Sequence, residues 1–227
     1  MGFQDERLIA AGLSIATVFL YLNVSPEVGT PFAIMTLLYL ISLGSSAFQK
    51  IEIMRTPTKI SEIVGVGLVA LSGWVILSSF ALQYLAPAFA PQSVFSLDFF
   101  QALSAQTQIP ILSADPFVRF LTYGVVIPII ETVFFLSFVL VFWAKALRQP
   151  LVFSPRQMLL VAVLVGATGS LFHLTVRIAQ NYALFADFLF FFISALIVLK
   201  YREMSHAMVF HILNNSIVVY TLLVAGR

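Results

Sequence analysis

Long apolar stretches dominate the sequence and leave little room for a soluble fold. The chain has 227 residues, of which 60% are hydrophobic and only 10% are charged, whereas a soluble domain carries roughly 25% charged residues. A membrane-spanning helix needs about 20 consecutive, mostly apolar residues. We therefore predict an all-α, polytopic integral membrane bundle of about seven transmembrane helices, forming a single domain over residues 1–227. The predicted helices are Leu8–Val24, Pro31–Phe48, Ile60–Leu85, Phe117–Leu147, Gln157–Ile178, Tyr182–Lys200 and Met204–Ala225.

The composition also excludes several classes of protein. The chain has no cysteine, so it has neither a disulfide framework nor a cysteine-ligated metal site. The formal net charge is only +2, and the positive residues are scattered over the loops between apolar stretches. Nucleic-acid binding requires basic residues gathered on one soluble face. We expect no nucleic-acid partner.

The positive charges predict how the helices are oriented, because Lys and Arg are enriched in cytoplasmic loops. With the N-terminus in the cytoplasm, nine of the 12 positive residues fall on the inner side. We predict a multi-pass protein of the cell membrane with a cytoplasmic N-terminus and an outer C-terminus. The inner set is Arg7, Lys50, Arg55, Lys59, Lys145, Arg148, Arg156, Lys200 and Arg202, and the outer set is Arg119, Arg177 and Arg227.

A few polar residues lie inside the predicted helices. Glu131 lies in the fourth helix, His173 in the fifth, and His211 and Asn215 lie four residues apart in the seventh. A charged side chain at the bilayer centre costs roughly 2.5–3.5 kcal/mol, so such residues mark functional sites by default. Residues four apart share one face of a helix. Together these groups suit a water-activating site, with Glu131 as the base, the imidazoles holding a metal or an oxyanion, and Asn215 polarising a carbonyl.

Two local sequence features should shape the helices around these groups. Pro128 lies three residues before Glu131 and should loosen the helix, freeing backbone carbonyls for water or substrate. The residues from Gly166 to Ser170, just before His173, are all small. Small residues let a neighbouring membrane helix approach closely.

Other polar residues have structural interpretations. Asp187 is placed to pair with Arg177 in a salt bridge, and we favour that role over catalysis. Asn214 suits hydrogen bonding between helices, a common role of Asn in membrane bundles. His206 is predicted to lie at the cytoplasmic boundary of the membrane. A lone buried histidine in a helix bundle is about as often structural as functional, which applies to His173 and His211 taken singly.

Three ordered motifs resemble the CPBP family of intramembrane proteases, which includes the CaaX prenyl endoproteases. They are PIIETVFFLS from Pro128, a histidine in a Gly- and Ser-rich helix, and LKYREMSHAMVFHILNNS ending at Ser216. The family's last motif, His-x-x-x-Asn, is intact between His211 and Asn215. The resemblance covers roughly residues 128–219, within a site region of about 117–225.

The other two motifs depart from the family pattern. The first normally has two consecutive Glu and an Arg four residues after the second, but here Thr132 and Leu136 follow Glu131. The second is Phe-x-x-x-His, but Gly169 precedes His173 in place of Phe. In this family the first Glu and the two His activate water and the Asn supports the oxyanion. The resemblance thus assigns catalysis to Glu131, His173, His211 and Asn215.

The resemblance predicts an intramembrane endopeptidase that cleaves a membrane-associated or lipidated peptide, for example a prenylated one. No cofactor follows with certainty, although Glu131, His173 and His211 form a conceivable set for a divalent metal such as zinc. A catalytically weakened scaffold that binds a membrane partner is the alternative, because the second Glu and the Arg are missing. A small transporter is a third possibility, disfavoured because no two-half repeat is visible.

Overall fold

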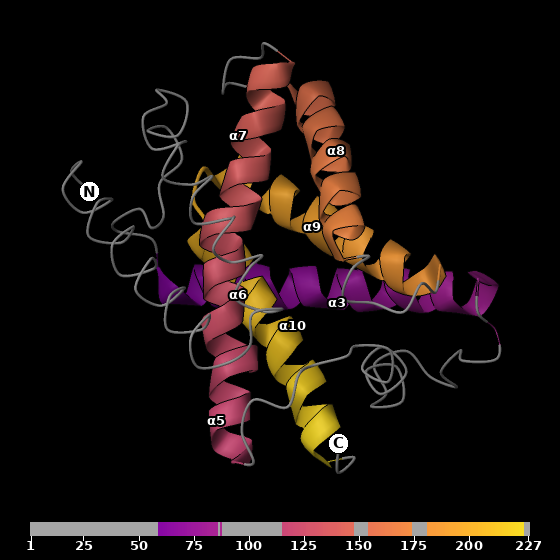
Figure 1. The fold of residues 1–227 in the computed structure, drawn as a ribbon. Helices are drawn as coiled ribbons and strands as arrows, with labels where there is room; N and C mark the ends of the chain where they lie inside the picture. The colour runs from indigo at the N-terminus through magenta and orange to yellow at the C-terminus, as the bar shows by residue number, and fades with distance from the viewer. Residues whose placement is uncertain (1–58, 86, 88–114, 148–153, 174–180, 225–227) are drawn as a thin grey trace.

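The computed structural model describes residues 59–85, 87, 115–147, 154–173 and 181–224. Nearly all of these residues are helical, and no strand occurs among them. Five consecutive segments, α5 to α7, make one long helix over residues 116–146, which Figure 1 shows as an unbroken coil. The elements are α3 (Ile60–Leu85), α5 (Pro116–Phe120), η3 (Leu121–Val126), α6 (Ile127–Ile130), η4 (Glu131–Leu136), α7 (Ser137–Ala146), α8 (Pro155–His173), α9 (Asn181–Tyr201) and α10 (Ser205–Val224).

Five of the predicted helices match these elements closely. The prediction for Ile60–Leu85 has the same bounds as α3, and those for the long helix, α9 and α10 differ by one residue at each end. The predicted helix Gln157–Ile178 begins two residues earlier, as α8, and its last five residues lie outside the described ranges. The predicted helices Leu8–Val24 and Pro31–Phe48 also lie outside them.

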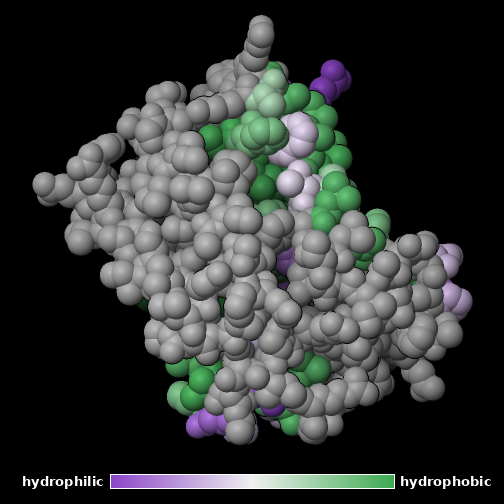
Figure 2. Space-filling model, in the orientation of Figure 1, coloured by the Kyte–Doolittle hydropathy of each residue, from purple (hydrophilic) through white to green (hydrophobic). Residues whose placement is uncertain are grey.

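The described helices identify a multi-pass membrane protein. Four of them are long and apolar enough to cross a bilayer, and α8 provides a shorter apolar helix. Figure 2 shows that the described residues visible on this face are mostly hydrophobic. Exposed apolar side chains include Val69 and Phe80 on α3 and Leu171 on α8. A surface of this kind suits lipid contact. The four candidate spans are Ile60–Tyr84, Pro116–Val133, Leu184–Tyr201 and Ser205–Val224.

The long helix begins at a strong capping signal and then changes its hydrogen-bond pattern. The Asp115 carboxylate accepts hydrogen bonds from the backbone N–H groups of Phe117 and Val118, and Pro116 occupies the first helical position. Both features favour a helix start. Two π-helical segments, η3 and η4, then flank the short α6 that contains Pro128. Such wide turns occur frequently at functional sites.

Helices α8 and α9 pack closely through the predicted small residues. A side-chain carbon at Gly166 would lie 2.9 Å from the Phe188 carbonyl oxygen, so only glycine permits this approach. One turn later, the Ser170 hydroxyl donates to the Leu184 carbonyl oxygen at 2.7 Å. The prediction of a close helix contact here is therefore confirmed, and the neighbouring helix is α9.

Helix α3 crosses the other helices (Figure 1) and packs on α9 and α10. The Trp74 indole N–H donates to the Ala186 carbonyl oxygen at 2.9 Å, which fixes α3 against α9. A side-chain carbon at Gly67 would lie 3.3 Å from the Phe210 backbone nitrogen, so the absence of a side chain brings α3 close to α10.

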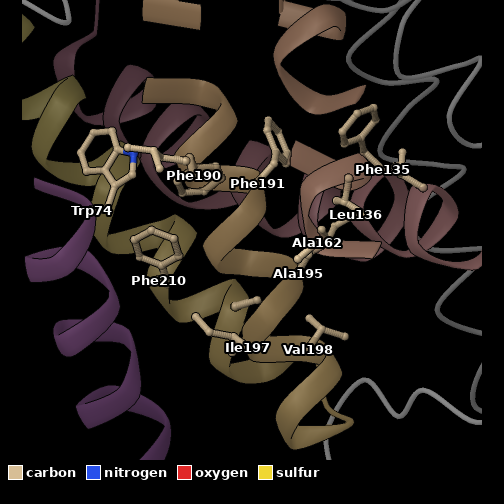
Figure 3. Close-up of a cluster of buried hydrophobic side chains, with 14 of the residues drawn as sticks. Trp74, Phe135, Leu136, Ala162, Phe190, Phe191, Ala195, Ile197, Val198 and Phe210 are labelled. Atoms are coloured by element: carbon tan, nitrogen blue, oxygen red, sulfur yellow. The ribbon is translucent and has the colours of Figure 1, made fainter. Parts of the chain in front are cut away.

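A chain of aromatic rings joins the helices at the core (Figure 3). The Phe190 ring lies 6.4 Å from Trp74, 4.8 Å from Phe210 and 5.3 Å from Phe191. Phe191 in turn meets Phe135 of η4 at 5.2 Å, with the planes inclined by 65°. Edge-to-face pairs of this kind stabilise packing beyond simple contact. The core thus centres on α9, which contacts α3, α10 and the long helix.

Candidate active site

Glu131 and His211 meet although 80 positions separate them in sequence. The His211 Nε2 atom lies 3.2 Å from the Glu131 Oε2 atom. Glu131 is the first residue of η4, and His211 lies in the second turn of α10. Both side chains are largely buried, with 16% and 6% of their surfaces exposed. The pair lies in two of the four candidate spans. The predicted convergence of these two residues therefore occurs in the structure.

The other ring nitrogen of His211 also has a polar partner. The Thr132 hydroxyl oxygen lies 3.0 Å from the His211 Nδ1 atom, and Thr132 is almost wholly buried. The Phe190 ring packs edge-on against the imidazole, with centroids 4.6 Å apart. His211 is therefore held at both nitrogens and along its face. The sequence interpretation had counted Thr132 only as the loss of a family carboxylate.

Pro128 explains why α10 brings polar side chains to the long helix. In a regular α-helix the Gly124 carbonyl accepts from the N–H of residue 128, which proline lacks. In a π-helix the carbonyl of residue i accepts from the N–H of residue i+5, so the Tyr123 carbonyl would also need the N–H that residue 128 lacks. The Ser216 hydroxyl donates to the Gly124 oxygen at 3.2 Å, and the Asn215 amide donates to the Tyr123 oxygen at 3.4 Å.

The predicted release of carbonyls by Pro128 thus has a different consequence from the one expected. Side chains of α10 satisfy both carbonyl oxygens, in place of water or substrate. These contacts place Asn215 one turn after His211 on the side of α10 that faces the long helix. One amide N–H of Asn215 is used in this way, and a carboxamide has two.

These contacts yield a test by a double-mutant cycle. In the natural background, Ser216→Ala should lower the free energy of unfolding by about 0.6 kcal/mol, the average for such bonds in membranes, and by no more than about 1.7 kcal/mol. In a Pro128→Ala background the cost should shrink, because residue 128 then offers an N–H to the Gly124 oxygen. Thermal or denaturant unfolding in detergent micelles measures the coupling.

Ser72→Ala is the matched control for this cycle. The Ser72 hydroxyl donates to the Leu68 carbonyl oxygen of its own helix at 2.9 Å, far from Pro128 in sequence. Its small effect should be the same in both backgrounds. Equal costs of Ser216→Ala with and without Pro128 would show that the proline does not free the Gly124 carbonyl.

His173 does not join Glu131 and His211 in a metal-binding group. The described residues contain no set of three or more His, Asp or Glu side chains placed to hold one metal ion. The His173 Nδ1 atom lies 2.9 Å from the Gly169 carbonyl oxygen of its own helix, and its ring meets Phe191 at 5.2 Å. Glu131, His173 and His211 therefore do not form one such group among the described residues, and the zinc set stays a prediction.

The remaining polar residues differ in part from their predicted roles. Asp187 is buried, and its predicted partner Arg177 lies outside the described residues. The Asn214 amide donates to the Asn215 side-chain oxygen at 3.2 Å, a contact within α10. Besides the contacts of His211, Asn215 and Ser216 connect α10 to the long helix by hydrogen bonds.

A second buried polar cluster lies where α9 turns into α10. Glu203 is only 2% exposed, and its carboxylate accepts a hydrogen bond from the Ser205 hydroxyl. The His206 Nδ1 atom lies 3.4 Å from that hydroxyl and 4.0 Å from the Glu203 carboxylate. The imidazole stacks on Tyr201 at 4.3 Å. His206 was predicted at the membrane boundary, but its side chain is enclosed by protein. The sequence signal that could have indicated this cluster is a Glu three residues before a His at the start of a helix.

Searches for similar proteins yield no match, whether against family models, curated proteins or solved structures.

Proposed function

We propose that the chain is an intramembrane endopeptidase of the CPBP type. The observation that carries this proposal is the contact of 3.2 Å between the Glu131 carboxylate and the His211 imidazole, deep within apolar helices. Ionisable side chains within membrane-spanning helices cost free energy to insert, so they usually belong to functional sites. The ordered motifs around Glu131, His173 and His211 support the same reading. The substrate class would be a membrane-associated or lipidated peptide.

In the proposed reaction Glu131 is the general base. A water molecule beside the carboxylate attacks the peptide carbonyl carbon, and its proton passes to a Glu131 oxygen. The carboxylic acid then donates that proton to the peptide nitrogen as the carbon–nitrogen bond breaks. General acid–base catalysis of this kind contributes typically 10²–10⁴-fold in rate. The His211 Nε2–H group donates to the carboxylate and orients it.

Asn215 is the proposed oxyanion donor. Its second amide N–H remains for the oxygen that becomes negative as the carbonyl carbon is attacked, and such preorganised donors are usually a large part of catalysis. His173 has its assigned role only through the family resemblance. A divalent metal such as zinc at Glu131, His173 and His211 stays a prediction, and the proposed reaction uses only the protein's own side chains and water.

The proposed setting is the cell membrane, with the N-terminus in the cytoplasm and the C-terminus outside. The support is the distribution of Lys and Arg, nine of 12 of which then fall on the inner side. Peptide substrates tethered by a lipid would reach Glu131 from within the bilayer or from its surface.

A second candidate function is a membrane scaffold derived from such a protease. Two observations favour it. Thr132 and Leu136 replace the second Glu and the Arg of the first motif, and the described residues contain no group of three or more His, Asp or Glu side chains that could hold a metal. A protein of this kind would bind a membrane partner without cleaving it.

Purified protein in lipid nanodiscs separates the two candidates. It is offered a farnesylated peptide, the same peptide without the lipid, and a panel of transmembrane peptides, and products are identified by mass spectrometry. The protease predicts cleavage that His211→Ala abolishes, because the base loses the group that orients it. Absence of cleavage by the natural sequence, with a stoichiometric membrane partner that co-purifies with it, would support the scaffold and overturn the protease.

A further inference from the structure

Glu131 and Thr132 are consecutive, yet both reach the same imidazole. Neighbouring side chains on a regular helix diverge too much to face one another. Here they lie in the π-helical segment η4, whose wider turn holds more residues and separates successive side chains by a smaller angle. The His211 ring lies between them, with Nε2 toward Glu131 and Nδ1 toward Thr132. The backbone of η4 therefore presents an acid and a hydroxyl to one base.

We infer that Thr132 is a positioning residue that orients His211 for Glu131, an inference that rests on the proposed function. The hydroxyl donates its hydrogen to Nδ1, which leaves the ring hydrogen of neutral His211 on Nε2. That N–H then points at the Glu131 carboxylate, a charge-assisted arrangement. The hydroxyl is nearly inaccessible to water, with Thr132 only 2% exposed.

A hydroxyl performs this task differently from the carboxylate of the family motif. A carboxylate only accepts hydrogen bonds, so at this position it would favour a doubly protonated imidazole. A threonine hydroxyl both donates and accepts. Thr132 therefore keeps its bond to Nδ1 whether His211 is neutral or protonated. Threonine at position 132 therefore still orients His211, although only one carboxylate, that of Glu131, lies beside the imidazole.

The inference predicts distinct behaviour for two variants of Thr132. Thr132→Val keeps the shape and removes the hydroxyl, whereas Thr132→Ser keeps the hydroxyl and removes a methyl group. In protein labelled with ¹⁵N-histidine, the chain gives only three imidazole sets, and the His211→Gln variant assigns the one from His211. The Nδ1 resonance of His211 should have the position of a hydrogen-bonded acceptor nitrogen in the natural protein. It should shift to that of a free acceptor in the Val variant and return in the Ser variant.

Kinetics provide the second measurement. Thr132→Val should lower kcat for peptide cleavage by at least about tenfold, with KM little changed and with an altered pH profile, because an orienting hydrogen bond is lost. Thr132→Ser should recover most of the rate. A threonine that serves only in packing would show the opposite order, because Val keeps its shape and Ser does not.

The outcomes separate this inference from the proposed function. An Nδ1 resonance that is unchanged in Thr132→Val overturns the positioning role, even if the protein cleaves peptides. The predicted resonance shift in a protein that cleaves no peptide supports the contact and overturns the proposed protease. Thermal unfolding of each variant confirms that the folded protein is being compared.

Discussion

Replacing Glu131 with glutamine is expected to slow peptide cleavage by at least about 10²-fold, the usual contribution of a positioned acid–base group. Glutamine has nearly the same shape, and its carbonyl oxygen still accepts a hydrogen bond from His211 Nε2. It cannot take a proton from water. The variant should therefore bind substrate with an unchanged KM and fold at least as well, because it removes a partly buried charge from apolar surroundings.

Glu203→Gln is the matched control. Glu203 is also buried, and the glutamine oxygen still accepts the hydrogen bond from Ser205. Steady-state cleavage and thermal unfolding are measured for both variants in the same lipid. We expect near-natural cleavage for Glu203→Gln. Full activity in Glu131→Gln would mean that another group accepts the proton, and the proposed mechanism would be wrong.

The helices themselves were predictable because hydropathy alone specifies them. A bilayer requires every backbone polar group to be satisfied within the helix, so a long apolar run has few alternatives. This explains why α3, α9 and α10 begin and end within one residue of their predicted bounds. The count of seven helices stays a prediction, since its first two members lie outside the described residues.

The candidate site was predictable only in part. Spacing along one helix shows which residues share a face, but it does not show which residues of another helix they contact. His211 and Asn215 were rightly placed on one face, and Glu131 was rightly placed beside His211. The role of Thr132 could not be read from sequence, because it depends on the π-helical turn at η4. The burial of Glu203 depends in the same way on how α9 turns into α10.

Gly169 shows how a departure from the motif can be offset by another helix. The CPBP motif that the sequence resembles has a phenylalanine at this position, four residues before the histidine. In the structure, a side-chain carbon at Gly169 would overlap the Phe191 ring of α9. That ring also lies 5.2 Å from the His173 ring. Phenylalanine is thus supplied beside His173 by α9 instead of α8.

Gly169→Phe is therefore expected to abolish folding, although it makes the sequence more similar to the CPBP motif. The new side chain would need the space of Phe191, whose own Cβ atom lies only 2.9 Å from the position of a Cβ at Gly169. Phe191→Gly removes this Cβ atom together with the ring; alone it should cost about 3–5 kcal/mol of stability for the cavity and about 1 kcal/mol more for a glycine within a helix. The two changes together should recover folded protein, because one ring again fills one space.

Size-exclusion chromatography and thermal unfolding in detergent measure this rescue for the natural protein, both single variants and the double variant. Gly65→Phe is the control, since no heavy atom lies within 4 Å of a side-chain carbon built there, and it should be tolerated. Recovery in the double variant beyond the sum of the single effects would establish that Phe191 and position 169 share one space. If Gly169→Phe folds as well as Gly65→Phe, the close approach of α8 and α9 is wrong. The His173 ring would then lack the aromatic contact that fixes its place in the bundle.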